Sequence, residues 1–422
     1  MKVFLRAVLF VLAAFILLAE LGCGDQYRPV ANPIVGPGGQ PQATHFAYVV
    51  NYNPNGNGSV SKIDVSGDSV SYVQTLGVGS IYEALPPSST ALFVANSGND
   101  TVSDYSAFAN GPVTNIGLLP GSHPVFLTAS QNANMYVLNA GANSACPNSG
   151  SVSVMTVTTG SVTNTSCVGQ NPINMVQAAN AGQIFVLNQA DNMNQGSVSV
   201  LNAPSLGLVT TLTSANGLGL HPVYATSTAD GTYVLVVTRG DGVNPGTLDI
   251  LTTGATPTVA ASVPLGVNPT YSYLDPTLDR LYVTNTGDNT VSVFDASNVN
   301  PANTPPIPSL TTPVPVGTSP TGVAALRDGS RFYVANSGSN NVSVVSATSF
   351  AVLSVVPVGT NPTFVATDPT STKVYITNKG SFSTSIIQTV NDTISLVIAA
   401  PAQDPTCTGS CALQQPIMAI TQ

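Results

Sequence analysis

The chain has 422 residues, of which 43% are apolar and only 7% are charged. Its 10 basic and 19 acidic residues give a formal net charge of −9. Nucleic-acid binding requires a basic face that displaces counterions, so nucleic acid is not expected as a partner. Gly (37) and Pro (32) are abundant and Trp is absent. This composition is typical of many short strands joined by tight turns, not of a disordered chain.

The first 22 residues have the pattern of an export signal. Lys2 and Arg6 precede an apolar stretch at 7–19, and Gly22 stands directly before Cys23. A small residue before Cys resembles the lipobox of bacterial lipoproteins, in which the Cys is acylated, although Glu20 stands where that family usually has Leu. We therefore predict lipidation at Cys23. The alternatives are an ordinary cleaved signal and an uncleaved anchor.

The segment 23–43 is rich in Pro and Gly and has no hydrophobic period, which predicts a linker between the lipid and a globular body at 44–422. The protein is thus expected in the periplasm or at the cell surface, in contact with the membrane only through its lipid anchor.

Four further cysteines, an even number, remain if Cys23 carries lipid: Cys146, Cys167, Cys407 and Cys411. In an exported protein this number predicts two disulfides. Three pairings are open, and closeness in sequence favours Cys146–Cys167 with Cys407–Cys411. A four-Cys zinc site is the alternative, but the cysteines lack C-x-x-C spacing and the compartment would be oxidising.

One short apolar segment recurs eight times, at intervals of 42 to 51 residues. Its copies lie at 48–51, 93–96, 136–139, 185–188, 235–238, 282–285, 333–336 and 375–378. Each copy is followed by a second alternating strand such as SVSVL at 197–201, and then by a third that ends in a Gly turn. A period of 40–50 residues with several strands per unit indicates a β-propeller.

A fourth strand follows the turn G-x-x-P and is short and apolar, as in PTFVAT at 362–367. We expect it to be the innermost strand of each blade. The first copy has no such strand before it, but the segment 416–421 has the same pattern, so we expect it to complete the first blade and close the ring. The predicted fold is all-β, with eight four-stranded antiparallel blades. Seven is the alternative if the divergent copy at 233–254 is irregular.

Two copies carry a family resemblance. The run Leu281-Tyr282-Val283-Thr284-Asn285, then 289–295 (NTVSVFD) and 315–317 (PVG), resembles the YVTN β-propeller repeat of surface-layer-like proteins and of a bacterial periplasmic propeller family. The resemblance covers nearly all of 45–422. It implies a propeller, usually of seven blades, and a binding or surface role. Related propellers include lactonases and redox enzymes.

Each blade is counted from its innermost strand, so that the recurring apolar segment is its second strand. The loops after the second and fourth strands should then share one face, which also carries the insertions 53–58, 140–150, 189–196 and 240–246. The residue before each G-x-x-P proline should ring the channel mouth on this face: His123, Asn171, His221, Asn268, Ser319, Asn361 or Gln415. The first junction, 79–83, has no Pro, and Glu83 occupies a position that is Thr or apolar in the other copies.

A ligand site at the channel mouth is therefore expected from His123, His221 and Glu83, with Asn171, Asn268 and Asn361. Two His and a carboxylate suit a divalent metal, and no other cofactor is predicted. The alternative is that all of these are solvated turn residues, and for the Asn set we favour this interpretation.

No catalytic motif is present: the chain lacks G-x-S-x-G, H-E-x-x-H and a P-loop, so no catalytic residue is assigned. The predicted function is a membrane-tethered binding scaffold of the cell envelope, expected to be a monomer. Its partner would be an envelope protein, a glycan or a small molecule. The alternative is a lactonase-like hydrolase with a metal or small-ligand site at the channel mouth.

Overall fold

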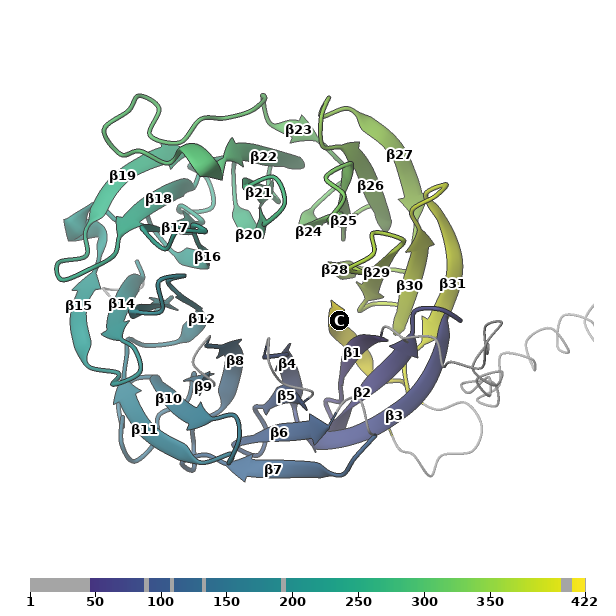
Figure 1. Cartoon of the computed structure of the whole chain (residues 1–422), viewed down its shortest axis with the longest axis horizontal. Helices are drawn as coiled ribbons and strands as arrows, with labels where there is room; N and C mark the ends of the chain where they lie inside the picture. Colours follow the sequence, from purple (N-terminus) through teal and green to yellow (C-terminus); the bar gives the residue numbers. More distant parts are fainter. Residues whose placement is uncertain are drawn as a thin grey trace, which may run out of the picture.

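The computed structural model describes residues 46–86, 91–106, 110–130, 134–190, 195–403 and 412–421. These residues form eight four-stranded antiparallel sheets, arranged as blades around a common axis (Figure 1). The predicted eight-bladed propeller is confirmed. The predicted signal, linker and lipidation site all lie outside the described residues.

The first half of the ring has four blades, each with its innermost strand named first. Blade 1 contains β32 (Gln415–Thr421), β1 (Phe46–Tyr52), β2 (Asn57–Asp64) and β3 (Ser69–Val78). Blade 2 contains β4 (Ser80–Ala84), β5 (Ala91–Asn96), β6 (Thr101–Ser106) and β7 (Val113–Gly117). Blade 3 contains β8 (Pro124–Ala129), β9 (Asn134–Asn139), β10 (Ser151–Thr156) and β11 (Val162–Cys167). Blade 4 contains β12 (Pro172–Gln177), β13 (Gln183–Asn188), β14 (Ser197–Asn202) and β15 (Leu208–Leu212).

The second half of the ring repeats the pattern. Blade 5 contains β16 (Pro222–Ser227), β17 (Tyr233–Thr238), β18 (Thr247–Thr252) and β19 (Val259–Pro264). Blade 6 contains β20 (Pro269–Asp275), β21 (Arg280–Asn285), β22 (Thr290–Asp295) and β23 (Val314–Pro315). Blade 7 contains β24 (Pro320–Ala325), β25 (Arg331–Asn336), β26 (Asn341–Ser346) and β27 (Val352–Pro357). Blade 8 contains β28 (Pro362–Thr367), β29 (Lys373–Asn378), β30 (Ser383–Gln388) and β31 (Thr393–Ala399). Two short 3-10 helices, η1 (Ser214–Asn216) and η2 (Ala296–Asn298), lie in connecting loops.

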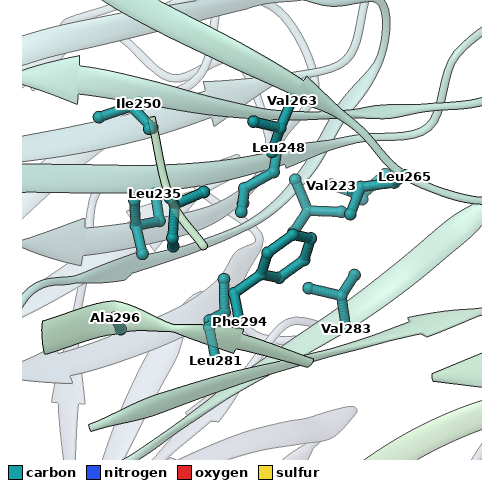
Figure 2. Close-up of a cluster of buried hydrophobic side chains, with 12 residues drawn as sticks. Val223, Leu235, Leu248, Ile250, Val263, Leu265, Leu281, Val283, Phe294 and Ala296 are labelled. Atoms are coloured by element: carbon teal, nitrogen blue, oxygen red, sulfur yellow. The ribbon is translucent and has the colours of Figure 1, made fainter. Parts of the chain in front are cut away.

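The core lies between the blades. Every blade is covered on both sides by its neighbours, so the second strands are buried on both faces; all six residues of β13, for example, are buried. Figure 2 shows one such cluster, in which Leu235 and Leu248 of blade 5 pack against Leu281 and Phe294 of blade 6. Burial of each such side chain contributes roughly 1.5–3 kcal/mol, which explains why the repeats have almost no charged residues in these strands.

The Asn that ends the second strand is a structural residue. Asn139 is buried, and its Nδ2 donates to the hydroxyls of Ser151 (3.1 Å) and Ser153 (3.0 Å) on the next strand. Equivalent bonds join Asn188 to Ser197 and Ser199. The recurring Ser of the third strand is therefore the acceptor for this amide, because a buried amide without a partner would be costly.

The divergent copy at 233–254 is a regular blade. In blade 5, Thr238 replaces the Asn and Asp249 replaces the Ser, and the hydroxyls of Thr238 and Thr247 join the two strands at 2.7 Å. Asp249 is fully buried and accepts from the Thr247 hydroxyl (2.8 Å), the Ser262 hydroxyl (2.7 Å) and the Gly219 N–H (2.6 Å). Burial raises the pKa of Asp249 and these hydrogen bonds oppose the rise. The divergence is therefore compensated within the blade, and the seven-bladed alternative does not apply.

The ring is closed as expected by the C-terminal segment. Strand β32 pairs with β1 in antiparallel register, from Ala47 opposite Thr421 to Tyr52 opposite Gln415. Blade 1 thus combines the first three strands of the chain with the last one, and neither end leaves an unpaired inner edge.

Candidate functional site at the mouth of the ring

The residue before each innermost strand has a left-handed backbone, which explains the residue types found there. The φ angles are 46° at His123, 48° at Asn171, 54° at His221, 51° at Asn268 and 52° at Asn361. Asn and His adopt this region more readily than most residues. The carbonyl of this residue accepts from the residue after the second strand, as in Arg239 N to His221 O at 2.9 Å. Both predicted histidines therefore lie at the upper face, which we define as the face of the loops that follow the second and fourth strands.

The prediction for Glu83 was wrong in its register. Ser80 pairs with Asn96 as Pro124 pairs with Asn139, and Gly79 has the left-handed φ of 69°. The Gly of the first junction is therefore Gly77, two residues earlier than the sequence pattern suggested. Glu83 consequently falls three positions after the proline position, opposite Val94, inside the blades instead of at the mouth.

Glu83 is 1% exposed, and neither of its carboxylate oxygens has a hydrogen-bond partner among the described residues. The buried hydroxyl of Tyr48 also has no hydrogen-bond partner among the described residues, and it interacts electrostatically with Glu83. Burial raises the pKa of Glu83 well above its usual range. Burial without hydrogen-bond partners thus favours the neutral form of this acid, and the side chain lies inside the blades, away from any ion at the mouth.

Among the described residues, two cavities that share no lining residue open on the upper face. The first, which we call the Arg239 cavity, has a volume of about 560 Å³. It lies at blades 4 to 6 and is lined by Asn171, Gln189, Ala190, His221, Arg239, Gly240, Asp241, Gly242 and Asn268. The second, the Lys379 cavity, has a volume of about 690 Å³. It lies at blades 8, 1, 2 and 3 and is lined by Tyr52, Asn53, Pro54, Val78, Gly79, Ile81, Ser97, Gly98, His123, Lys379 and Ile417.

The Arg239 cavity is polar and contains one cation without an anionic partner. The Nε of Arg239 is buried with no hydrogen-bond partner in the described part of the chain, where no ion pair of its guanidinium is found either. The neighbouring Asp241 is occupied by its own loop: it accepts from the backbone N–H groups of Asn244 (2.6 Å) and Val243 (3.0 Å) and from the Asn244 amide (2.6 Å). The bonds from Asn244 and Val243 lower the pKa of Asp241, so it stays ionised at the rim.

Below the mouth, aromatic rings from five blades fill the centre of the ring. Each follows a register shift near the start of its innermost strand, as between Pro124 and Phe126. The ring centroids lie 4.1 Å apart for Tyr82 and Phe126, 4.6 Å for Tyr224 and Tyr271, and 6.0 Å for Tyr271 and Phe364. The Tyr224 hydroxyl is hydrogen-bonded to those of Tyr82 and Tyr271. Blades 2 and 5 are three apart, so this contact crosses the axis.

The structure thus divides the predicted site. Asn171, His221 and Asn268 line the Arg239 cavity, His123 lines the Lys379 cavity, and Asn361 lines neither. Within the described residues no group of three or more His, Cys, Asp or Glu is placed to hold a metal ion.

Sequence reasoning missed Arg239 and Lys379. Both directly follow the strand-end residue, a position held elsewhere by Tyr52, Ser97, Ala140, Gln189, Thr286 and Ser337. The signal that could have found them is that only these two copies place a cation there.

The predicted disulfide between Cys146 and Cys167 is confirmed, with Cα atoms 5.4 Å apart. It ties the insertion after β9 to the outer strand β11. Cys407 and Cys411 lie outside the described residues. No helix in the described segments is long and apolar enough to cross a membrane.

These features define an eight-bladed propeller with two cavities of small-molecule size on one face. Residues 137–382, more than half of the chain, match the family model described as "Lactonase, 7-bladed beta-propeller". The chain therefore belongs to this lactonase propeller family, and its eight blades depart from the seven in the family description. The YVTN resemblance stays a prediction.

Known structures share the fold at low sequence identity. Apo AztD from Citrobacter koseri is similar over 90% of this chain and 98% of its own, with 11% identity and a TM-score of 0.61. A Bacteroides fragilis protein described as a candidate 6-phosphogluconolactonase covers the same shares, with 13% identity and a TM-score of 0.57. Kuenenia stuttgartiensis hydrazine synthase is 19% identical over 72% of this chain and 95% of its own, with a TM-score of 0.56. None of the curated proteins matches the sequence.

Proposed function

We propose that this protein is an exported, membrane-tethered propeller that binds a small polar anion in the Arg239 cavity. The observation that carries the proposal is the guanidinium of Arg239, which lines a polar cavity without an anionic partner among the described residues. Asn171, Gln189 and Asn268 supply amides around it. Guanidinium recognises carboxylate or phosphate, and amides recognise hydroxyls, so a sugar acid or sugar phosphate fits this chemistry.

Lactone hydrolysis is the second candidate, supported by the family match, which spans both His221 and Arg239. In such a step the His221 imidazole would take a proton from water as the hydroxyl attacks the lactone carbonyl. Arg239 would stabilise the oxyanion. The ring C–O bond then breaks, and the proton passes from the imidazolium to the leaving alkoxide. Water is the only co-reactant, and no metal is required.

Calorimetric titration with 6-phosphogluconate tests the binding proposal. Arg239→Gln should weaken binding at least tenfold, because a charged hydrogen bond contributes about 1.5–3 kcal/mol. Arg327→Gln is the charge-matched control: it removes a cation from an exposed turn on the opposite face and should leave the affinity unchanged. Equal affinity of Arg239→Gln and the wild type would exclude the Arg239 cavity as the anion site.

A second variant distinguishes the binding function from lactone hydrolysis. His221→Asn should keep the left-handed backbone, since Asn171, Asn268 and Asn361 occupy the equivalent position. If the protein is a lactonase, hydrolysis of 6-phosphogluconolactone should fall at least 100-fold in His221→Asn while binding of 6-phosphogluconate persists. If the wild type hydrolyses the lactone no faster than buffer does, only the binding function stands.

The cell-envelope location is supported by the Cys146–Cys167 disulfide, because disulfides persist in oxidising compartments. Cys23→Ser should move the protein from the membrane to the soluble fraction, since two acyl chains anchor stably and none would remain. Fractionation with immunodetection measures this, and continued membrane association would exclude Cys23 as the anchor. An envelope protein or a glycan is the partner proposed for the upper face if no small anion binds.

A further inference from the structure

We infer that the Lys379 cavity is a second ligand site, built for a small amphipathic acid with an apolar or aromatic body and one acidic group. Its volume of about 690 Å³ lies within the range of small-molecule sites. It draws its walls from blades 8, 1, 2 and 3, so it exists only because the ring closes between the two ends of the chain.

The apolar part of the site is its floor. Ile81 and Ile417 lie at the register shift of the innermost strands β4 and β32, and both are half-buried. Val78, at the end of β3, is 37% exposed although it is a large apolar residue. Tyr52 adds an aromatic side chain. Apolar side chains collected in one concave site are typical of small-molecule sites.

The residues that form the apolar floor can be compared with those at the same strand position in other blades. In blades 6, 7 and 8, the position of Ile81 and Ile417 is held by Thr270, Thr321 and Thr363. There, the hydroxyls bond within the ring, as from Thr321 to the Pro362 carbonyl at 3.0 Å. The fold thus accepts Thr at this position, and Ile in blades 1 and 2 gives this cavity its apolar floor.

The charged part is the Lys379 ammonium group. Lys379 is exposed, and its ammonium group has no ion pair or hydrogen bond within the described segments. The carboxylate of Asp100, which lies 3.7 Å from the His123 Nδ1, accepts from the backbone N–H groups of His123 (2.7 Å) and Gly121 (2.8 Å). Lys379 therefore offers an uncompensated positive charge beside an apolar floor, which complements an amphipathic acid.

His123 adds a directional contact. Its side chain is 57% exposed, and its Nδ1 lies 2.9 Å from the Ser97 carbonyl. A carbonyl accepts only, so in the neutral ring Nδ1 carries the hydrogen and Nε2 is an acceptor. Nε2 can then accept from a hydroxyl or N–H on the ligand body, on the blade 3 side of the cavity.

The Arg239 cavity lacks these features, since its lining contains no large apolar residue. The two cavities are thus chemically distinct, and the proposal for one can fail its test while the proposal for the other stands.

The probe for the Lys379 cavity is 8-anilinonaphthalene-1-sulfonate, an aromatic anion whose fluorescence rises in apolar surroundings. The neutral N-phenyl-1-naphthylamine reports on the floor alone.

The wild type should bind one equivalent of the anionic probe. Lys379→Gln should weaken this binding at least fivefold and leave binding of the neutral probe unchanged, while Lys379→Arg should retain both. Ile81→Thr with Ile417→Thr should weaken both probes. The melting temperature should fall, since both side chains also pack against buried clusters, but the fold should persist because Thr occurs at this position in three blades. Arg327→Gln is the charge control.

Three results would overturn the inference. In the first, the wild type does not bind the anionic probe. In the second, Lys379→Gln binds this probe as tightly as the wild type does. In the third, Lys379→Gln and Arg327→Gln lose the same amount of affinity for this probe. The last would mean that the probe responds to net charge alone. Each result leaves the titration of the Arg239 cavity unaffected, since that experiment uses a different probe and a different cation.

Discussion

Removal of residues 415–422 is expected to lower the free energy of unfolding by more than about 5 kcal/mol. The deletion removes β32, with its six register pairs to β1. It also removes the cover that Ile417, Ala419 and Ile420 give to the neighbouring blades. Each lost hydrogen bond contributes about 1 kcal/mol and each large apolar side chain roughly 1.5–3 kcal/mol.

The effect is measured as the change in the guanidinium chloride concentration at the midpoint of unfolding. The reference protein consists of residues 44–422. A synthetic peptide of residues 412–422, added in excess, should restore part of the loss, because it can pair with the exposed edge of β1. A single-site companion is Ala419→Arg, which places a charge at a residue 2% exposed in the cluster at blades 8 and 1. An unchanged midpoint in the deletion would show that blade 1 does not need β32.

Replacement of Glu83 is expected to stabilise the protein increasingly as the pH rises. Burial raises the pKa of Glu83 in the folded state well above that of the unfolded chain. Between these two pKa values the folded state keeps a proton that the unfolded state has released. The wild type therefore loses about 1.4 kcal/mol of stability for each pH unit in this interval, and the loss is complete above the folded pKa.

Glu83→Met is the substitution of choice, because Met175 occupies the equivalent position in blade 4 and is buried there. Below pH 4, where both states are largely protonated, the difference between the variant and the wild type should be smallest and should reflect only the unpaired carboxyl group. As the pH rises above the unfolded-state pKa, the variant should become more stable than the wild type by about 1.4 kcal/mol per pH unit until the folded-state pKa is reached, as measured from denaturant midpoints across the pH range. Asp328→Asn removes a carboxylate from an exposed turn and is the control. A stability difference that does not change with pH would mean that Glu83 is ionised in the folded state.

The position of Glu83 also bears on the Lys379 cavity. Glu83 follows Tyr82, one of the rings that fill the centre, and the Ile81 before it is part of the floor of the Lys379 cavity. Ionisation of this buried acid would require water or a cation to enter between blades 1 and 2. Probe binding to the Lys379 cavity at high pH, compared between Glu83→Met and the wild type, would show how closely the floor depends on the protonation of Glu83.

Much of the fold followed from the sequence, for a physical reason. A repeat that must be buried on both faces shows itself as recurring apolar strands, and the turns between them need Gly, Asn or His at a left-handed position. Hence the eight blades, the closing strand at 416–421 and the local Cys146–Cys167 pairing could all be predicted. Each of these depends on contacts within one blade or on a pattern repeated in every blade.

The site depended on the tertiary structure. In the sequence, either Gly77 or Gly79 could be the first residue of the turn before β4. The pairing of Ser80 with Asn96 shows that it is Gly77, and this register places Glu83 in the interior. His123 and His221 share a repeat position, yet the ring places them in different cavities. Lys379 and Ile81 are about 300 residues apart in sequence and line one cavity. The sequence by itself determined the repeating module and favoured eight copies of it. Closure of the ring decided which side chains meet, because those contacts join different blades.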